Sequence, residues 1–385
     1  MKSILSNKKI FIIFFLTLAI IASIQSLLAV SKAPLKDKDY GKSNNYMIYQ
    51  RSFHHLVNNQ DLYAAYTEEA WDIYKYTPTC AVFFGFFAMF PFWLGLILWN
   101  VFNALLLLFA IYYLPNLSKI GKGLILLIIS IELMTSVQNG QSNGLIAGLL
   151  IFSFGLLENK KYLPAALCIV FSAFIKPFGL VGFAMFLFYP GKLKLILYSI
   201  LGTVILFLLP LIFIGISQYY NLLLNYWNMM SHDHSKSSGN SVMGWLNSWF
   251  YIDLNKNLIV LLGIIIFLIP LYKVKVYKNY TFRFLMLSSI LIWIVIFNHM
   301  AESPTFIIAM TGIALWFIKS EKNYFNIALF VLAFILTSLS PTDLFPKFLR
   351  EEFFKPYSMK AFPCIIIWLK IIYDMIMVKK EKITE

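Results

Sequence analysis

The chain has 385 residues, of which 60% are hydrophobic and only 13% charged, and this composition excludes a soluble globular domain. It predicts an all-α polytopic integral membrane protein. The net charge of +14 would suit a nucleic-acid-binding protein, but the position of the charges along the chain gives a different reason for it.

The first apolar run extends from Ile10 to Val30 and follows Lys8 and Lys9. It is 21 residues long, whereas a cleaved secretory signal has an apolar core of roughly 7 to 15 residues. This length is sufficient to cross a bilayer. Residues 1–30 are therefore predicted to form a retained signal-anchor span.

The polar segment 31–77 is predicted to be an external loop. Within it, Phe53, Leu56 and Val57 recur at helical spacing beside polar neighbours, which indicates an amphipathic helix on the membrane surface. The loop is rich in tyrosine, which is common where side chains meet the membrane interface. Its carboxylates are different, because a carboxylate near the membrane face is a candidate general base toward a hydroxyl acceptor.

Residues 78–378 are predicted to form the transmembrane bundle, followed by a tail at 379–385. Polar breaks divide the bundle into apolar segments at 78–114, 124–134, 144–157, 163–175, 178–190, 193–216, 258–272, 284–297, 305–318, 325–339 and 361–378. Segment 78–114 is interrupted at Pro91, which favours a re-entrant or interfacial helix before one full span. With that segment counted as one crossing, the chain has about 12 crossings in a single domain.

The basic residues give the orientation. With the amino terminus inside, the inner segments hold 18 Lys and Arg against 4 acidic residues, and the outer segments hold 13 against 12. Because Lys and Arg stay on the cytoplasmic side of a membrane, both termini are predicted to be cytoplasmic. The excess positive charge is then explained without nucleic acid.

The external side also receives the polar interruptions of the bundle. The segment from Ser136 to Gly144 contains Gln138, Gln141 and Asn143 between two apolar runs, and buried amides without partners are costly, so it is predicted to line a cavity. Lys176-Pro177 interrupts two other apolar segments. Its ammonium is a candidate ligand of a lipid phosphate, although a lysine that extends to the interface is the ordinary alternative.

The second external loop, 217–257, carries His232, His234, Asn240 and Ser241. Two histidines in a loop make a poor metal site, so hydrogen bonding to a sugar or phosphate is favoured. After the next span, His299 and Glu302 are three residues apart, which is one turn if the segment is helical, either as reactive groups or as an ordinary helix cap. Glu132 lies inside a span and needs a partner there, whereas nothing is assigned to the third external loop, 340–360. Cys80, Cys168 and Cys364 show neither metal-binding nor disulfide spacing.

The order of these motifs resembles glycosyltransferase family 87, the polyprenol-phosphate-mannose-dependent mannosyltransferases of the GT-C type. The resemblance covers about residues 44–317. It is carried by Tyr76-Thr77-Pro78, Gln141-Ser142-Asn143, Lys176-Pro177, Asn240-Ser241 and the segment from His299 to Pro304.

This resemblance implies an inverting transfer of a hexose, usually mannose, from a polyprenyl-phosphate sugar to a hydroxyl of an external glycan or glycolipid acceptor. It implies no nucleotide sugar and no essential metal. Family members commonly carry an aspartate before the first-loop tyrosine as base, whereas Asn44 and Asn45 stand at the matching positions, and an asparagine does not accept a proton. The catalytic candidates are therefore Asp37, Asp39, His299 and Glu302.

The polyprenyl phosphate is expected near Lys176 and the Gln138-to-Asn143 segment, with the acceptor entering under the 31–77 loop. The residues expected to bind substrates are Asn44, Asn45, Tyr49, Tyr63, Tyr76, Pro78, Gln138, Gln141, Asn143, Lys176, His232, His234, Asn240 and Ser241. A bacterial plasma membrane is the expected location. A transporter or flippase is the first alternative, although the polar insertions lie at one face and no internal repeat is found. A polymerase or ligase of lipid-linked glycans is the second.

Overall fold

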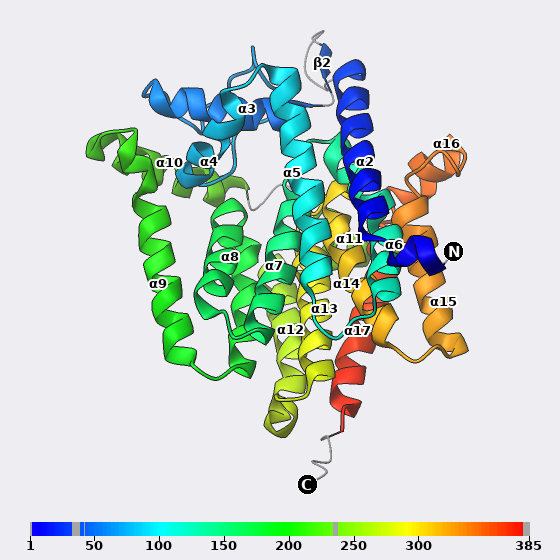
Figure 1. The fold of residues 1–385 in the computed structure, drawn as a ribbon. Coiled ribbons are helices and arrows are strands. Elements are labelled where there is room, and N and C mark those ends of the chain that lie inside the picture. The colour runs from blue at the N-terminus through cyan, green and yellow to red at the C-terminus, as the bar shows by residue number, and fades with distance from the viewer. Residues whose placement is uncertain (1, 33–38, 42, 234–237, 380–385) are drawn as a thin grey trace.

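The computed structural model describes residues 2–32, 39–41, 43–233 and 238–379, and helices make up most of them (Figure 1). The amino-terminal half contains α1 (Lys2–Ser6), α2 (Lys8–Leu28), α3 (Asn44–Val57), α4 (Pro78–Ala88), α5 (Phe92–Tyr113), α6 (Lys119–Gln138), α7 (Asn143–Glu158), α8 (Tyr162–Ile175) and the 3₁₀ helix η1 (Pro177–Phe188). Strands β1 (Val30–Lys32) and β2 (Asp39–Gly41) pair antiparallel.

The carboxyl-terminal half is also helical. It contains α9 (Lys192–Leu208), η2 (Leu209–Ile212), α10 (Ile216–Asp233), α11 (Val242–Phe250), α12 (Lys256–Leu268), η3 (Ile269–Tyr272), η4 (Val274–Val276), α13 (Tyr280–Ile296), η5 (Ser303–Thr305), α14 (Phe306–Lys319), α15 (Tyr324–Ala333), η6 (Phe334–Leu339), α16 (Lys347–Leu349), η7 (Arg350–Phe354) and α17 (Phe362–Met377). The fold is the predicted all-α membrane bundle.

Four helices in the described part of the chain are long and apolar enough to cross a membrane: α2, α5, α6 and the α9–η2 pair. The shorter apolar helices fill the positions of the remaining predicted spans, among them α7, α8, α13 and α14. A bundle of about 12 crossings is compatible with this set, because several short helices continue into 3₁₀ turns of apolar sequence, as α12 continues into η3.

Segment 78–114 has the shape that Pro91 predicts. It forms the 11-residue α4 and the 22-residue α5, and the break falls between Ala88 and Phe92. Hydrogen bonds hold both ends of α4. At its start, Thr77 donates to the Phe174 carbonyl near the end of α8 at 2.7 Å, and after its end, Gln50 of α3 donates to the Phe90 carbonyl at 3.1 Å. At about 1.5 Å per residue, 11 residues are too few to span a bilayer, so α4 stays at one face beneath α3 (Figure 1).

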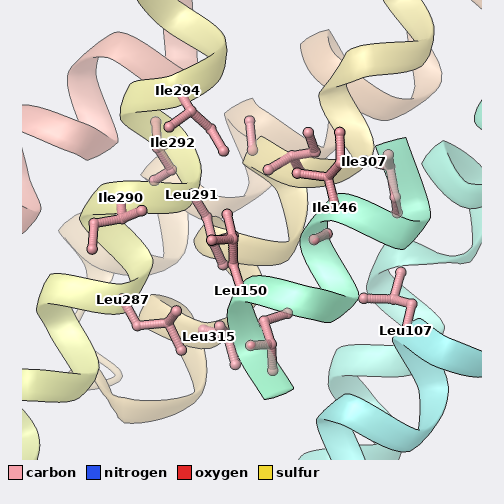
Figure 2. Packing of buried hydrophobic residues seen from close by; sticks show 14 of the residues in the cluster. Leu107, Ile146, Leu150, Leu287, Ile290, Leu291, Ile292, Ile294, Ile307 and Leu315 are labelled. Atoms are coloured by element: carbon pink, nitrogen blue, oxygen red, sulfur yellow. The ribbon is translucent and has the colours of Figure 1, made fainter. Parts of the chain in front are cut away.

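The core of the bundle is built around α7. Figure 2 shows its side chains Ile146 and Leu150 packed with α13, α14 and α5, and both are fully buried. Gly148 allows the close approach of α5, since a Cβ there would lie 3.1 Å from the backbone nitrogen of Leu107. Small residues at such crossings let helices pack closely in a membrane, where the hydrophobic effect gives little drive for association.

The basic segments gather at one end of the bundle. Tyr280 donates to the Pro115 carbonyl at 2.7 Å, and Arg283 pairs with Glu158 at 2.6 Å. Lys319 reaches the Asn116 carbonyl at 3.2 Å, and Lys273 reaches the Val378 carbonyl at 2.6 Å. Four segments that the charge pattern assigns to the same side therefore do lie together.

The second external loop differs from the prediction, because its described part is largely helical and contains α10 and α11. The third, 340–360, is helical only at the short α16 and η7 and otherwise consists mainly of turns. The reason in α10 is an apolar stripe at helical spacing: Tyr219, Leu222 and Met229 are buried against the first loop and α4. This packing fixes a helix in a segment whose overall composition is polar.

Candidate active site

Lys176 lies at the junction of α8 and η1, where Pro177 prevents α8 from continuing. Its ammonium donates hydrogen bonds to Oδ1 of Asn143 at 2.9 Å and to Oε1 of Gln141 at 3.3 Å. Both acceptors come from the polar break between α6 and α7. The structure therefore brings together two motifs that are more than 30 residues apart, as the sequence predicts.

Glu302 joins this cluster through Gln141. The Gln141 amide donates to Oε2 of Glu302 at 3.2 Å while its carbonyl oxygen accepts from Lys176. Asn143 supports the arrangement by donating to Gln141 at 3.2 Å and to the Pro304 carbonyl at 3.0 Å. A single amide thus links the ammonium to the carboxylate, and we call Gln141, Asn143, Lys176 and Glu302 the polar cluster.

Two tyrosines form the wall on the first-loop side. The hydroxyl groups of Tyr49 and Tyr76 lie 2.6 Å apart, and the ring of Tyr76 is 5.9 Å from the Lys176 ammonium. Burial raises the pKa of both Tyr49 and Tyr76. Both are therefore neutral near pH 7, where they act as hydrogen-bonding groups rather than as bases.

Two spaces of different chemistry lie near this cluster. An apolar groove of about 320 Å³ lies between α8, α9, α10 and η1, and its lining includes Pro177, which follows Lys176, and Thr77 and Pro78, which follow Tyr76. A polar cavity of about 730 Å³ lies on the other side, where Glu302 and Ser303 form part of its wall. The side chain of Glu302 is exposed to this polar cavity. The arrangement places a cation and a carboxylate near an apolar groove and a polar cavity.

Other predicted residues support this wall from behind. Oδ1 of Asn44 accepts from the backbone nitrogen of Trp71 at 3.1 Å, and Asn45 donates to the Asn139 carbonyl at 2.9 Å. Tyr63 donates to the Tyr76 carbonyl at 3.0 Å. These contacts hold the first loop against the α6–α7 break, so the three side chains lie near the polar cluster as structural supports.

Asn240 and Ser241 lie on the polar-cavity side. The backbone nitrogen of Asn240 donates to the Ala301 carbonyl at 2.8 Å, and Ser241 caps α11 at the backbone nitrogen of Gly244. Gly239, with a φ of +53°, packs its backbone against His299 and Ala301. The backbone of His299 therefore lies beside Gly239, which lines the same cavity as Glu302.

Two predicted residues lie elsewhere. Gln138 donates to Gln25 of α2 at 2.6 Å and lines a different cavity of about 760 Å³, whose walls come mainly from α6, η5 and residues 341–350. His232 lines a third space of about 310 Å³ with Asp61 and Tyr63. Asp37 and His234 lie outside the described residues, as does the side chain of Asp39, although its backbone belongs to β2.

Lys360 is a residue near the site that the sequence analysis did not assign. Its ammonium lies 2.9 Å from Glu132 and donates to the Ser303 hydroxyl at 2.8 Å. Glu132 is fully buried in α6, and Lys360 also lines the polar cavity. A carboxylate inside a span is costly unless it is paired or protonated, and here Lys360 is its partner.

The chain was compared with known proteins to identify its family. A search of curated proteins finds no match. Among solved structures, the crystal structure of ArnT from Cupriavidus metallidurans bound to undecaprenyl phosphate is similar over 95% of this chain and 76% of that chain. The sequence identity is 9% and the TM-score 0.43.

The model of glycosyltransferase family 87 matches residues 74–298, which is more than half of the chain. The matched range includes Tyr76, the α6–α7 break, Lys176 and Asn240, and ends four residues before Glu302. The chain is therefore a member of glycosyltransferase family 87 and an integral membrane glycosyltransferase.

Proposed function

We propose that this protein transfers a hexose from a polyprenyl-phosphate sugar to a hydroxyl group of an external acceptor, and that this hexose is mannose. The observation that carries the proposal is the hydrogen-bonded path from Lys176 through Gln141 to Glu302. The path brings an ammonium and a carboxylate close together, near an apolar groove and a polar cavity, and this supports a phosphate-binding role for Lys176 and a proton-accepting role for Glu302.

In this mechanism the donor phosphate lies against Lys176, and the polyprenyl chain enters the groove lined by Thr77 and Pro177. Two of the three N–H donors of Lys176 form hydrogen bonds to Asn143 and Gln141. The third is assigned to a phosphate oxygen. An ammonium on a long stem suits a single phosphate, which it meets as a point charge.

The acceptor hydroxyl attacks C1 of the sugar on the side opposite the phosphate. The bond from C1 to the phosphate oxygen breaks with inversion, and the hydroxyl proton passes to Glu302. The leaving phosphate keeps the electron pair of that bond, and Lys176 stabilises the resulting charge. Because a phosphate leaves without an acid and Lys176 supplies the positive charge, the proposal needs neither a nucleotide sugar nor a metal ion.

The site is assigned to the external face with both termini cytoplasmic. Two observations support this orientation. The basic segments gather at one end of the bundle, and the polar cluster lies at the opposite end, where α6 ends, α7 begins and α8 ends. Because Lys and Arg are retained on the cytoplasmic side, the basic end faces the cytoplasm.

The test uses purified protein and a panel of polyprenyl-phosphate sugars, with release of polyprenyl phosphate as the readout. Transfer is expected from the mannosyl donor, and Lys176→Met should reduce it at least about 100-fold, the effect of losing one charge-stabilising group. Lys119, an exposed lysine at the start of α6 and at the basic end of the bundle, provides the matched control, and Lys119→Met should retain transfer. Unchanged turnover in Lys176→Met would remove Lys176 from the site.

A further inference from the structure

We propose that the polar cavity beside Glu302 is the acceptor subsite and that it receives the uncharged, hydroxyl-rich end of a glycan. The inference rests on the proposed function, since it assigns the second substrate of the same reaction. Its volume of about 730 Å³ lies within the range of roughly 300 to 1,000 Å³ typical of ligand pockets.

The walls of the cavity are held in place by hydrogen bonds between segments that are distant in sequence. Asn240 donates its backbone N–H to the Ala301 carbonyl at 2.8 Å, which fixes the start of α11 against the turn before η5. Trp249 of α11 donates to the Tyr357 carbonyl at 2.8 Å, which fixes the other end of α11 against the 340–360 segment. Three segments that are distant in sequence therefore enclose one space.

The lining is suited to hydroxyl groups. Besides Glu302, it presents the amides of Asn240 and Asn247 and the hydroxyls of Ser248, Ser340 and Ser358. Amide and hydroxyl side chains both donate and accept hydrogen bonds, as sugar hydroxyls do. A sugar hydroxyl in this space would also lie on the side of the Glu302 carboxylate that the proposed proton transfer requires.

The charges of the lining favour a neutral ligand. Among the described residues of the lining, three cations each have a carboxylate within 4 Å: Lys360 has Glu132 at 2.9 Å, Arg350 has Asp343 at 2.7 Å and Lys355 has Glu351 at 3.5 Å. The charge that remains among these described residues is the carboxylate of Glu302, which opposes a second negative charge nearby. A phosphate-bearing group therefore fits this cavity less well than an uncharged sugar.

The family match covers part of this cavity. Asn240, Asn247 and Ser248 lie inside the matched range 74–298, whereas Glu302 and the whole 340–360 wall lie beyond it. The proposed acceptor subsite thus combines a part of the chain that the family model covers with a part that it does not cover.

The test compares two tryptophan substitutions in the full-length protein. Asn247→Trp reduces the volume of the proposed subsite, and Asn225→Trp reduces the volume of the other cavity, which is lined by Asp61, Tyr63 and His232. The acceptor probes are octyl diglycosides of mannose, glucose and galactose, each with and without a 6-phosphate. Binding to donor-free protein is measured by calorimetry, and transfer is measured with polyprenyl-phosphate-mannose.

Asn247→Trp is expected to weaken binding of the best neutral diglycoside at least about tenfold, with the KM for the donor unchanged, and Asn225→Trp to leave both unchanged. Ser248→Tyr reduces the same cavity from the neighbouring position and should repeat the result if Asn247→Trp proves unstable in thermal unfolding. No effect of either cavity variant, or a larger effect of Asn225→Trp, would overturn the proposal and place the acceptor elsewhere. Tighter binding of the phosphorylated probes would overturn the charge assignment.

These outcomes are separate from those of the proposed function. If neutral diglycosides bind and Asn247→Trp weakens them, but no sugar is released from any polyprenyl-phosphate donor, the acceptor subsite stands and the proposed donor is wrong.

Discussion

Among the residues that the structure describes, Glu302 is the carboxylate of the polar cluster. It stands immediately before η5, where its backbone nitrogen donates to the Thr305 hydroxyl at 3.3 Å. Its side chain accepts from Gln141 and faces the polar cavity. With Asn44 and Asn45 in place of an acidic residue, and Asn44 occupied by the Trp71 backbone, Glu302 becomes the favoured base.

Replacing this carboxylate by an amide tests that role. Glu302→Gln retains an oxygen for the Gln141 hydrogen bond but accepts no proton, so transfer should fall by about 10²- to 10⁴-fold, the usual contribution of a general base. The measurement is the release of polyprenyl phosphate at saturating donor. Thermal unfolding should be unchanged, because the side chain is exposed and its volume is preserved. Full activity in this variant would exclude Glu302 and leave His299 as the next candidate.

Residue type and position were sufficient to predict most of the polar cluster. Gln141, Asn143 and Lys176 interrupt apolar segments, and polar groups at such positions require partners. Gln138 was assigned to the same site because it belongs to the same polar stretch. It is still part of α6, however, and the helical phase turns it toward Gln25 of α2. Where the helix ends therefore decides which glutamine reaches Lys176, and the sequence does not fix that boundary closely.

At the scale of elements, the buried pair of Glu132 and Lys360 ties α6 to the segment that precedes α17. The two residues are 228 positions apart, and the Lys360 side chain is only 6% exposed. Lys360 also donates to the Ser303 carbonyl at 3.1 Å, next to Glu302. The pair thus positions the η5 turn that carries the proposed base, although neither residue contacts the polar cluster.

Breaking the pair on one side should be more harmful than replacing both partners. Lys360→Met leaves the Glu132 carboxylate buried without a cation, which typically costs about 3 to 5 kcal/mol of stability, whereas a buried pair replaced by neutral groups is often tolerated. The double variant Glu132→Gln with Lys360→Met should therefore recover much of the stability, as measured by thermal unfolding in detergent. Equal losses in the single and double variants would contradict a direct coupling of the two charges.

Other elements show how far helical patterns could be predicted. The short α4 follows from Pro91, and α3 follows from the spacing of Phe53, Leu56 and Val57. The helix α10 was missed because its polar composition resembled a loop, although its buried side chains recur every three or four residues. The partner of Glu132 could not be predicted, because a contact over 228 positions leaves no periodic signal in one sequence.

At the scale of the whole molecule, the bundle has two chemically different ends. The basic segments meet at one end through contacts such as Arg283 with Glu158 and Lys319 with Asn116. The apolar groove, the polar cluster and the polar cavity meet at the other end. A donor whose lipid tail stays in the membrane and an acceptor that comes from the aqueous side would thus reach the polar cluster from different directions.

This organisation predicts the accessibility of single cysteines in intact cells. Asn247 is exposed on the polar-cavity side, and Glu321 is exposed between α14 and α15 at the basic end. A membrane-impermeant maleimide should label Asn247→Cys in intact cells, and Glu321→Cys only after permeabilisation. Background labelling should be low, because Cys80 and Cys364 are buried and Cys168 lies half-buried in α8, and the unsubstituted chain measures it. The opposite pattern would place the polar cluster in the cytoplasm and the termini outside. Labelling of both variants in intact cells would show that the basic end is also accessible from outside, which contradicts retention of Lys and Arg on the cytoplasmic side.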